Sequence, residues 1–249
     1  TRKESSAASD VYKRQVQIMK GVRALTFDLD NTLWETDASI LRAEDAMARH
    51  LRTLTPTRWM AEFTLDAFHA VRKEVIKEQP QIAHNLTTIR KETLKRWFEN
   101  RGATNAVAED LANEGFQVFY EERQNVTPYP GTVATLSGLS KNFKLAAITN
   151  GNADLMAMQI GRYFKFSLQS QHFPEPKPAP VMFEEALKRL KVDPHECMHV
   201  GDDIEHDVMG AQQVGMKTVW FNMHSRSPKG DTLADYVITD LRELLRLLK

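Results

Sequence analysis

The sequence has little cysteine, no excess charge of either sign and no long apolar run. Its single cysteine, Cys197, cannot form a disulfide within the chain. We expect a buried core thiol there, because no second cysteine or activating group adjoins it. Lys and Arg together number 33, as do Asp and Glu, so no overall field favours nucleic acid or an anionic membrane. No apolar stretch approaches the roughly 18 residues of a membrane span. These features favour a cytoplasmic protein without nucleic-acid or membrane partners.

The chain has enough length and apolar content to build a sizeable core. It has 249 residues, of which 42% are hydrophobic, which suits one large domain or two smaller ones. Residues 1–15 are polar and lack periodicity, so we predict a disordered leader or a segment of artificial origin there. They are left out of the fold prediction.

From Val22 onward, short apolar, β-branched runs alternate with stretches of helical period. This pattern predicts an α/β fold, a Rossmann-like parallel sheet flanked by helices, formed by residues 16–35 and 126–249. Crossover helices are expected at Thr132–Leu139 and Pro180–Leu190. The predicted strands are Ala24–Leu29, Lys144–Thr149, Phe166–Gln169, Met198–Gly201, Thr218–Phe221 and Tyr236–Thr239.

Residues 36–125 interrupt this alternation with helical patterns and no convincing strand, which predicts an inserted all-helical domain. Trp59, Phe63 and Trp97 have helical spacing, so we expect them in a bundle core rather than stacked on a flavin-like ring. The helical stripes are Ile40, Met47, Leu51 and Leu54; Phe63, Ala67, Phe68, Val71 and Val75; Leu86, Ile89, Thr93, Leu94 and Trp97; and Val107, Leu111, Phe116 and Phe119.

Residues able to handle a phosphate group lie at or just after the ends of several predicted strands, and a lysine precedes a predicted helix. Ligands of an open parallel sheet bind outside the carboxyl ends of its strands. Alone, each residue has an ordinary explanation, since Asp-x-Asp and Gly-Asp-Asp often serve as turns or caps and a lysine is usually solvated. Their joint occurrence at one rim favours a functional site. The residues are Asp28 and Asp30, Thr149, Lys177, and Asp202 with Asp203.

Clustered carboxylates of this kind suit Mg²⁺, which binds oxygen ligands and phosphate. A cation also relieves their mutual repulsion and their repulsion of a phosphate dianion. With Mg²⁺ and Lys177 neutralising charge, a carboxylate can attack phosphorus and form an aspartyl-phosphate. A second carboxylate can protonate the leaving oxygen and later deprotonate the attacking water.

The ordered motifs resemble the haloacid dehalogenase-like hydrolase superfamily, and the resemblance runs from about Val22 to the C-terminus. The four motifs are Phe27-Asp28-Leu29-Asp30-Asn31-Thr32-Leu33; Ile148-Thr149-Asn150-Gly151-Asn152; Pro176-Lys177-Pro178; and Gly201-Asp202-Asp203-Ile204-Glu205-His206-Asp207.

This resemblance implies roles for the motif residues. Asp28 would be the nucleophile and a metal ligand, and Asp30 the general acid/base that offers its backbone carbonyl to the metal. Asp202 would complete the protein's metal ligands. Thr149 and the Asn150 amide would hold the transferring phosphoryl group.

The remaining motif residues would support this chemistry. Lys177 would neutralise charge between nucleophile and phosphate, and Asp207 would orient Lys177. Asp203 stands where the family often has a small polar residue and would be a supporting group. Asp30 further favours phosphate over halide, because dehalogenating members differ at that position.

The helical insertion resembles the superfamily's cap. Among bacterial members, the chain is similar to phosphatases acting on flavin mononucleotide (FMN) and on 5-amino-6-(5-phospho-D-ribitylamino)uracil. Within the cap, His84 and Arg90 would either contact substrate or form a structural capping or surface pair. Three stretches carry this closer resemblance: Ala24-Leu25-Thr26-Phe27-Asp28-Leu29-Asp30, Ala147-Ile148-Thr149-Asn150-Gly151-Asn152-Ala153 and Ile82-Ala83-His84-Asn85-Leu86-Thr87.

We therefore predict a Mg²⁺-dependent phosphatase of small phosphorylated metabolites, with FMN or the riboflavin precursor as candidate substrates. A sugar phosphomutase using the same intermediate is the enzymatic alternative, and a non-catalytic binding module is the alternative from another class. The predicted assembly is a monomer or a homodimer.

Overall fold

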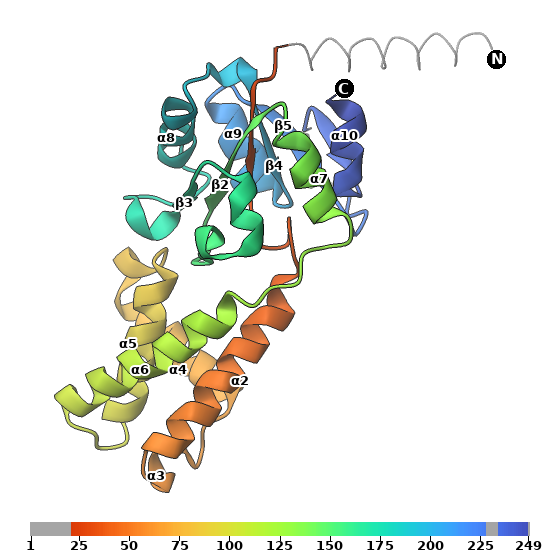
Figure 1. Cartoon of the computed structure of the whole chain (residues 1–249). Coiled ribbons are helices and arrows are strands. Elements are labelled where there is room, and N and C mark those ends of the chain that lie inside the picture. Colours follow the sequence, from red (N-terminus) through yellow and green to blue (C-terminus); the bar gives the residue numbers. More distant parts are fainter. Residues whose placement is uncertain (1–20, 228–233, 249) are drawn as a thin grey trace.

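A six-stranded, wholly parallel sheet forms the larger unit of the molecule (Figure 1). The computed structural model describes residues 21–227 and 234–248, so the predicted leader at residues 1–15 lies outside the described residues. The strand order is β3-β2-β1-β4-β5-β6. The strands are β1 (Ala24–Phe27), β2 (Lys144–Thr149), β3 (Ser167–Gln169), β4 (Cys197–Gly201), β5 (Lys217–Phe221) and β6 (Tyr236–Ile238).

Strand β1 lies where the strand order reverses. It pairs with β2 on one side and β4 on the other, so Phe27 lies beside both Ala147 and Val200. Such a switch point opens a crevice at the carboxyl ends of the strands. The residues that follow β1 are therefore placed at the mouth of this crevice.

Helices cover both faces of the sheet, as the alternation of strand side chains requires. On one face, Leu25 and Phe27 of β1 belong to a core that includes α7 and α10. On the other, Ala24 belongs to a core that includes α8 and α9. Figure 1 shows the two pairs on opposite sides of the strands. These helices are α7 (Thr132–Leu139), α8 (Val181–Leu190), α9 (Gly210–Gln213) and α10 (Leu244–Leu247).

The predicted strands are all present, but several bounds differ. Strand β1 ends at Phe27 rather than Leu29, because the chain turns immediately afterwards. The backbone N–H groups of Thr32 and Leu33 both donate to the carbonyl of Leu29, and Asn31 has a positive φ of 62°. The turn directs the residues after Phe27 away from the sheet.

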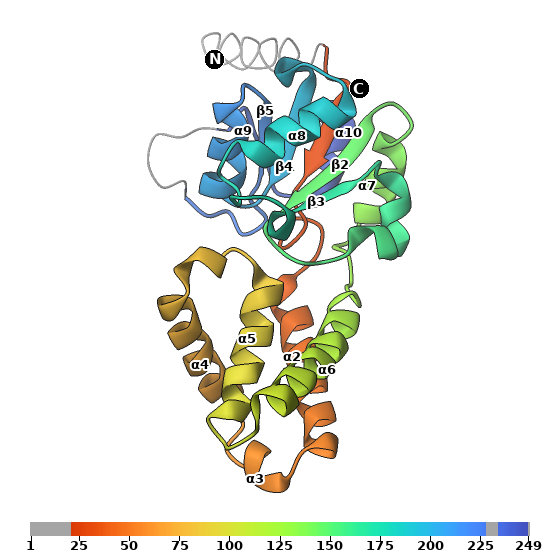
Figure 2. The same cartoon turned by 90° about the vertical axis from the view of Figure 1, so that its left-hand side faces the viewer.

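The helices between residues 36 and 123 form a second unit with its own apolar core (Figure 2). Two connections, into α2 and out of α6, join it to the sheet unit. The domain bounds at residues 35 and 125 remain a prediction. The helices are α2 (Thr36–Leu54), α3 (Thr57–Met60), α4 (Leu65–Glu78), α5 (Leu86–Glu99) and α6 (Asn105–Arg123).

Most residues of the predicted helical stripes belong to this second core. Trp97 and Phe63 are buried and meet edge to face, so their expected place in the bundle core is confirmed. Leu54 and Val107 were expected in the core but are exposed, since each lies near a helix end. In the described part of the chain, no helix combines the length and apolarity needed to cross a bilayer. Cys197 is buried and free, as expected.

Candidate active site

Most of the predicted site residues surround one pocket of about 430 Å³ at the carboxyl ends of the strands. We call it the carboxylate pocket. The cap contributes His84, from the loop before α5. Arg90 is the one predicted site residue that does not line it. The predicted residues that do are Asp28, Asp30, His84, Thr149, Asn150, Lys177, Asp202, Asp203 and Asp207.

Lys177 joins two carboxylates on the floor of this pocket. Its Nζ donates to Asp28 Oδ1 at 2.7 Å and to Asp207 Oδ1 at 2.5 Å. The lysine side chain is 2% exposed. Burial alone would lower the pKa of Lys177, but the Asp207 and Asp28 carboxylates outweigh it and hold this pKa above its ordinary value. The lysine is therefore a fixed cation.

The three neighbouring carboxyls differ in their affinity for a proton. Burial raises the pKa of Asp28 well above its ordinary value; Lys177 opposes the shift, and Asp207 and Asp202 add to it. Burial, followed by repulsion from Asp207, raises the pKa of Asp202 to about 6. Burial would also raise the pKa of Asp207, but Lys177 and His199 outweigh it and lower that pKa. Lys177 alone therefore does not supply enough positive charge to keep all three carboxyls ionised.

The donor set fits a hard cation. Carboxylate oxygens of Asp28, Asp202 and Asp207 lie within 4.8 Å of one another, and Mg²⁺ prefers such ligands. Thr32 Oγ1 donates to Asp28 Oδ2 at 3.2 Å and lies 3.3 Å from Asp202 Oδ1. Both oxygens of Asp207 already accept hydrogen bonds, from Lys177 and from the Asp203 N–H. Asp28 Oδ2 and Asp202 Oδ1, by contrast, share the single proton of the Thr32 hydroxyl, so Asp28 and Asp202 are better placed than Asp207 to ligate a metal.

The Asp30 side chain is held apart from this acidic cluster. Its Oδ1 accepts hydrogen bonds from Trp34 Nε1 and Thr36 Oγ1, both at 2.9 Å, and from Arg123 Nη2. Its Oδ2 faces Gly151 so closely that a Cβ there would lie 2.3 Å from this oxygen. One oxygen is therefore saturated with donors, while the other is directed into the pocket.

The loop after β2 presents a hydroxyl and positions the lysine. Thr149 Oγ1 accepts a hydrogen bond from the Gly151 N–H at 2.9 Å, which leaves the hydroxyl proton available to a ligand. The side-chain amide of Asn150 is used differently. It donates to the Lys177 carbonyl at 2.9 Å and accepts from the Lys177 N–H at 2.8 Å. The Asn150 side chain thus fixes Lys177.

Asp203 and the two predicted cap residues have distinct surroundings. Asp203 caps the following π-helical turn by accepting a hydrogen bond from the His206 N–H at 2.8 Å. His84 lines the carboxylate pocket, and its carbonyl accepts from Ser170 Oγ of the sheet unit at 3.2 Å. Arg90 is 7% exposed and pairs with Glu44 at 2.8 Å. His84 and Arg90 therefore do not form a pair.

Two residues outside the predicted site, His199 and Arg123, hold the acidic side chains in place. His199 lies in β4, 1% exposed, between Thr26 Oγ1 at 2.8 Å and Asp207 Oδ1 at 3.2 Å. A lone histidine in a buried strand was the available signal. Arg123 ends α6 and reaches Asp30, 93 residues away in sequence. No local sequence pattern predicts the contact between Arg123 and Asp30.

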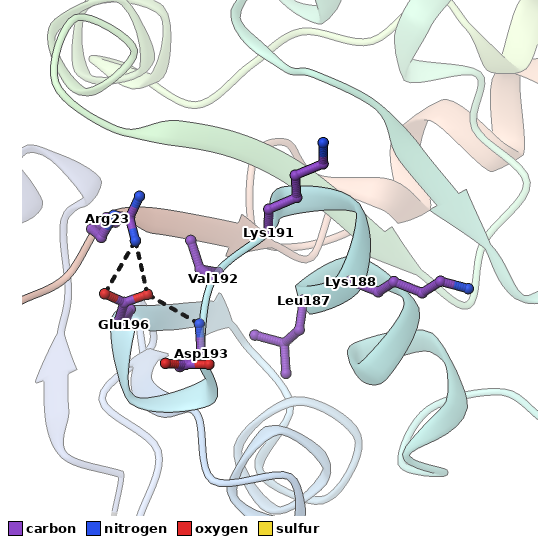
Figure 3. Close-up of a pocket in the computed structure, with 7 residues that line it drawn as sticks. All are labelled: Arg23, Leu187, Lys188, Lys191, Val192, Asp193 and Glu196. Atoms are coloured by element: carbon purple, nitrogen blue, oxygen red, sulfur yellow. Dashed lines mark hydrogen bonds and ion pairs between the residues drawn. The ribbon is translucent and has the colours of Figure 1, made fainter.

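Figure 3 shows a different pocket, of about 350 Å³, at the opposite end of the sheet. Arg23 and Glu196 precede β1 and β4, and their side chains form an ion pair at 3.2 Å. The carboxylates of the first and fourth motifs lie at the other ends of these strands. This pocket is separate from the candidate site.

Comparisons with known proteins agree with this geometry. A family model described as haloacid dehalogenase-like hydrolase matches residues 22–215. The 5-amino-6-(5-phospho-D-ribitylamino)uracil phosphatase of Escherichia coli is 32% identical over 212 residues, covering 85% of this chain and 87% of that protein. Human N-acylneuraminate-9-phosphatase is 30% identical over 239 residues, covering 92% and 94%.

A solved structure gives the same result for the fold. The crystal structure of a protein named 2-haloacid dehalogenase, from Pseudomonas syringae pv. Tomato DC3000, matches with a TM-score of 0.85 and 35% identity, covering 91% of this chain and 98% of that one. The predicted fold class and family resemblance are confirmed. The chain belongs to the haloacid dehalogenase-like hydrolases, and its relatives named as phosphatases identify it as a phosphoric monoester hydrolase.

Proposed function

We propose that this enzyme is a Mg²⁺-dependent phosphatase of small metabolites, with Asp28 as nucleophile and Asp30 as general acid/base. The supporting observation is that the two carboxyls have different hydrogen-bond partners and different charged neighbours. Lys177 and the acidic cluster surround Asp28, whereas Asp30 turns one oxygen to donors and the other to the pocket. Two carboxyls in contrasting surroundings suit two chemical roles.

In the first half of the reaction, a carboxylate oxygen of Asp28 attacks phosphorus and the bond to the leaving alcohol oxygen breaks. Asp30 gives that oxygen a proton from Oδ2, since its Oδ1 accepts from three donors. Lys177 and the Thr149 hydroxyl, which line the same pocket, hold the phosphoryl oxygens in this proposal. Mg²⁺, held by Asp28, Asp202 and the Asp30 backbone carbonyl, would neutralise developing negative charge.

In the second half, Asp30 takes a proton from a water molecule that attacks the aspartyl-phosphate. The phosphorus–Asp28 bond breaks, inorganic phosphate leaves and both carboxyls return to their starting states. Asp207 takes no part in bond changes but keeps Lys177 beside Asp28.

The proposed substrates are FMN or 5-amino-6-(5-phospho-D-ribitylamino)uracil. The identity to the Escherichia coli phosphatase over most of both chains supports the second of these compounds. A panel of these compounds, sugar phosphates, nucleotides and pyridoxal phosphate tests it by colorimetric phosphate release. We expect Mg²⁺-dependent release that favours the ribityl phosphates, and no release from any compound would refute the proposed function.

The same panel, with 2-chloropropionate added, separates the alternatives. A phosphomutase would isomerise sugar phosphates while releasing little phosphate, and a binding module would do neither. A dehalogenase would release chloride from 2-chloropropionate; the Asp30 carboxylate argues for phosphate instead. The cytoplasmic location and the monomeric or homodimeric state remain predictions.

Mg²⁺ affinity should weaken as pH falls through about 6. Asp202, with its pKa raised to about 6, is mostly protonated at pH 5, and a ligand must lose its proton to bind metal. This group alone weakens affinity about tenfold per pH unit below its pKa. Calorimetric titration with Mg²⁺ at pH 7.5 and pH 5 measures the difference.

Metal-free stability should change with pH in the same range. The raised pKa means that the folded state binds this proton more tightly than the unfolded chain, so the contribution of Asp202 to stability falls as pH rises from about 4 to about 6. The Asp202→Asn variant provides the control, because it lacks the titrating group. Equal Mg²⁺ affinity of the wild type at pH 7.5 and pH 5 would contradict the assignment of Asp202 as a metal ligand.

A further inference from the structure

A second pocket, of about 200 Å³, adjoins the carboxylate pocket and is lined largely by residues of the helical cap. We call it the arginine pocket. The two pockets share Asp30, Leu86 and Gly151 as lining residues. The arginine pocket therefore adjoins Asp30, beside which the leaving oxygen of a substrate would lie. Besides the shared Asp30, the polar residues that line the arginine pocket are Arg72, Arg90, Arg123, Asn152 and Thr36.

The three arginines have different partners. Arg90 is neutralised by Glu44, and its guanidinium lies 3.6 Å from the centre of the Phe119 ring. Arg123 is 1% exposed and uses Nη2 on Asp30. Within the described residues, its Nε and Nη1 are buried without a hydrogen-bond partner. Buried donors of this kind are costly unless something accepts from them.

Arg72, on α4, adds a third positive charge. No ion pair or hydrogen bond from its guanidinium is found among the residues that the structure describes. It is only partly buried. Burial is the main cause that lowers the pKa of Arg90, and Glu44 opposes it. Arg72 and Arg123 lower this pKa further, and it falls to about 10. The arginines are therefore close enough to repel one another, and the pocket carries an excess of donors and of positive charge.

We propose that the arginine pocket binds the far end of the substrate, a planar group that presents acceptor oxygens to Arg72 and Arg123. Either a carboxylate or the carbonyl edge of a pyrimidine-dione ring has this chemistry, because a guanidinium fork matches paired planar acceptors. A terminal alcohol does not. This inference rests on the proposed function, since it places the substrate's phosphate at Asp28.

Two pairs of substrates with matched chains test the proposal. One is 6-phosphogluconate with sorbitol 6-phosphate, which differ in a carboxylate against an alcohol. The other is 5-amino-6-(5-phospho-D-ribitylamino)uracil with ribitol 5-phosphate, which differ in the ring. We expect the acceptor-bearing member of at least one pair to have the higher kcat/KM by roughly 10- to 100-fold, as for hydrogen bonds to a charged group. The pair that shows it identifies the acceptor.

Arg72→Gln should reduce this preference by roughly tenfold or more, through a higher KM for the acceptor-bearing member. Arg72 is chosen because it is partly exposed, whereas replacing the buried Arg123 risks unfolding. Lys73→Gln is the matched control: it removes one positive charge from the same helix at an exposed residue that lines neither pocket. It should leave the preference unchanged.

The outcomes separate the two claims. Equal kcat/KM within both pairs would overturn the inference while leaving phosphatase activity intact. So would an Arg72→Gln variant that folds, as judged by its thermal midpoint, and keeps the full preference. Absence of phosphate release from all four compounds and from the wider panel would refute the proposed function itself.

Discussion

Asp28→Asn should lower kcat by about 10⁴-fold or more, the scale seen when a nucleophile is removed. The amide keeps the shape of the side chain but cannot attack phosphorus. Loss of fold should not explain the result, because burial raises the pKa of Asp28. The charged carboxylate is thus unfavourable in the metal-free protein, and its neutral replacement should keep or raise the thermal midpoint.

Phosphate release with the best panel substrate, together with thermal unfolding, measures both effects. Asp110→Asn is a matched control, since it makes the same chemical change at an exposed position on α6. A folded Asp28→Asn protein that retains about a tenth of wild-type kcat would remove Asp28 from the nucleophile role.

The sheet was predictable because its strands have a clear sequence pattern. The apolar run at residues 144–149 gives β2 with its predicted bounds. The end of β1 was predicted two residues too late, because Leu29, just beyond Asp28, is apolar and buried. Its carbonyl nevertheless starts the turn that contains Asn31. An apolar side chain indicates that a residue is buried, but it does not indicate where the backbone leaves the sheet.

The sequence predicted which residues form the site better than it predicted which of them contact one another. Motif order indicated that Lys177 and Asp28 would meet, and they do. It could not show that the Asn150 side chain would hold Lys177, nor that His84 and Arg90 would line different pockets. Those facts depend on the packing of the cap against the sheet, which brings together residues far apart in sequence.

The same packing makes Asp30 a point of connection between the two units. Arg123 from the end of α6 pairs with it. The adjacent Gln124 accepts a hydrogen bond from the Asp154 N–H at 2.6 Å. The orientation of the proposed acid/base residue therefore depends on the cap as well as on the motif that contains it. A cap substitution can alter catalysis without touching the phosphate.

Lys177→Met should lose both activity and stability. The change leaves Asp28 and Asp207 buried without their shared cation, and breaking a buried pair in this way costs about 3–5 kcal/mol. Urea unfolding at pH 7.5 measures the free energy of unfolding. Lys188→Met, at a side chain 82% exposed, is the control and should change it little.

The loss should shrink at lower pH, which distinguishes an electrostatic cause from poor packing. In the wild type, Lys177 helps to hold the pKa of Asp207 below its ordinary value, so this carboxylate stabilises the fold above about pH 4, and the contribution is lost as pH falls further. Without the lysine, burial dominates and the carboxyls take up protons at higher pH. The variant should therefore regain stability relative to the wild type between pH 7.5 and pH 5. Adding Asp207→Asn to Lys177→Met should recover part of the loss at pH 7.5, and a double variant less stable than Lys177→Met would show that the ion pair is not the cause.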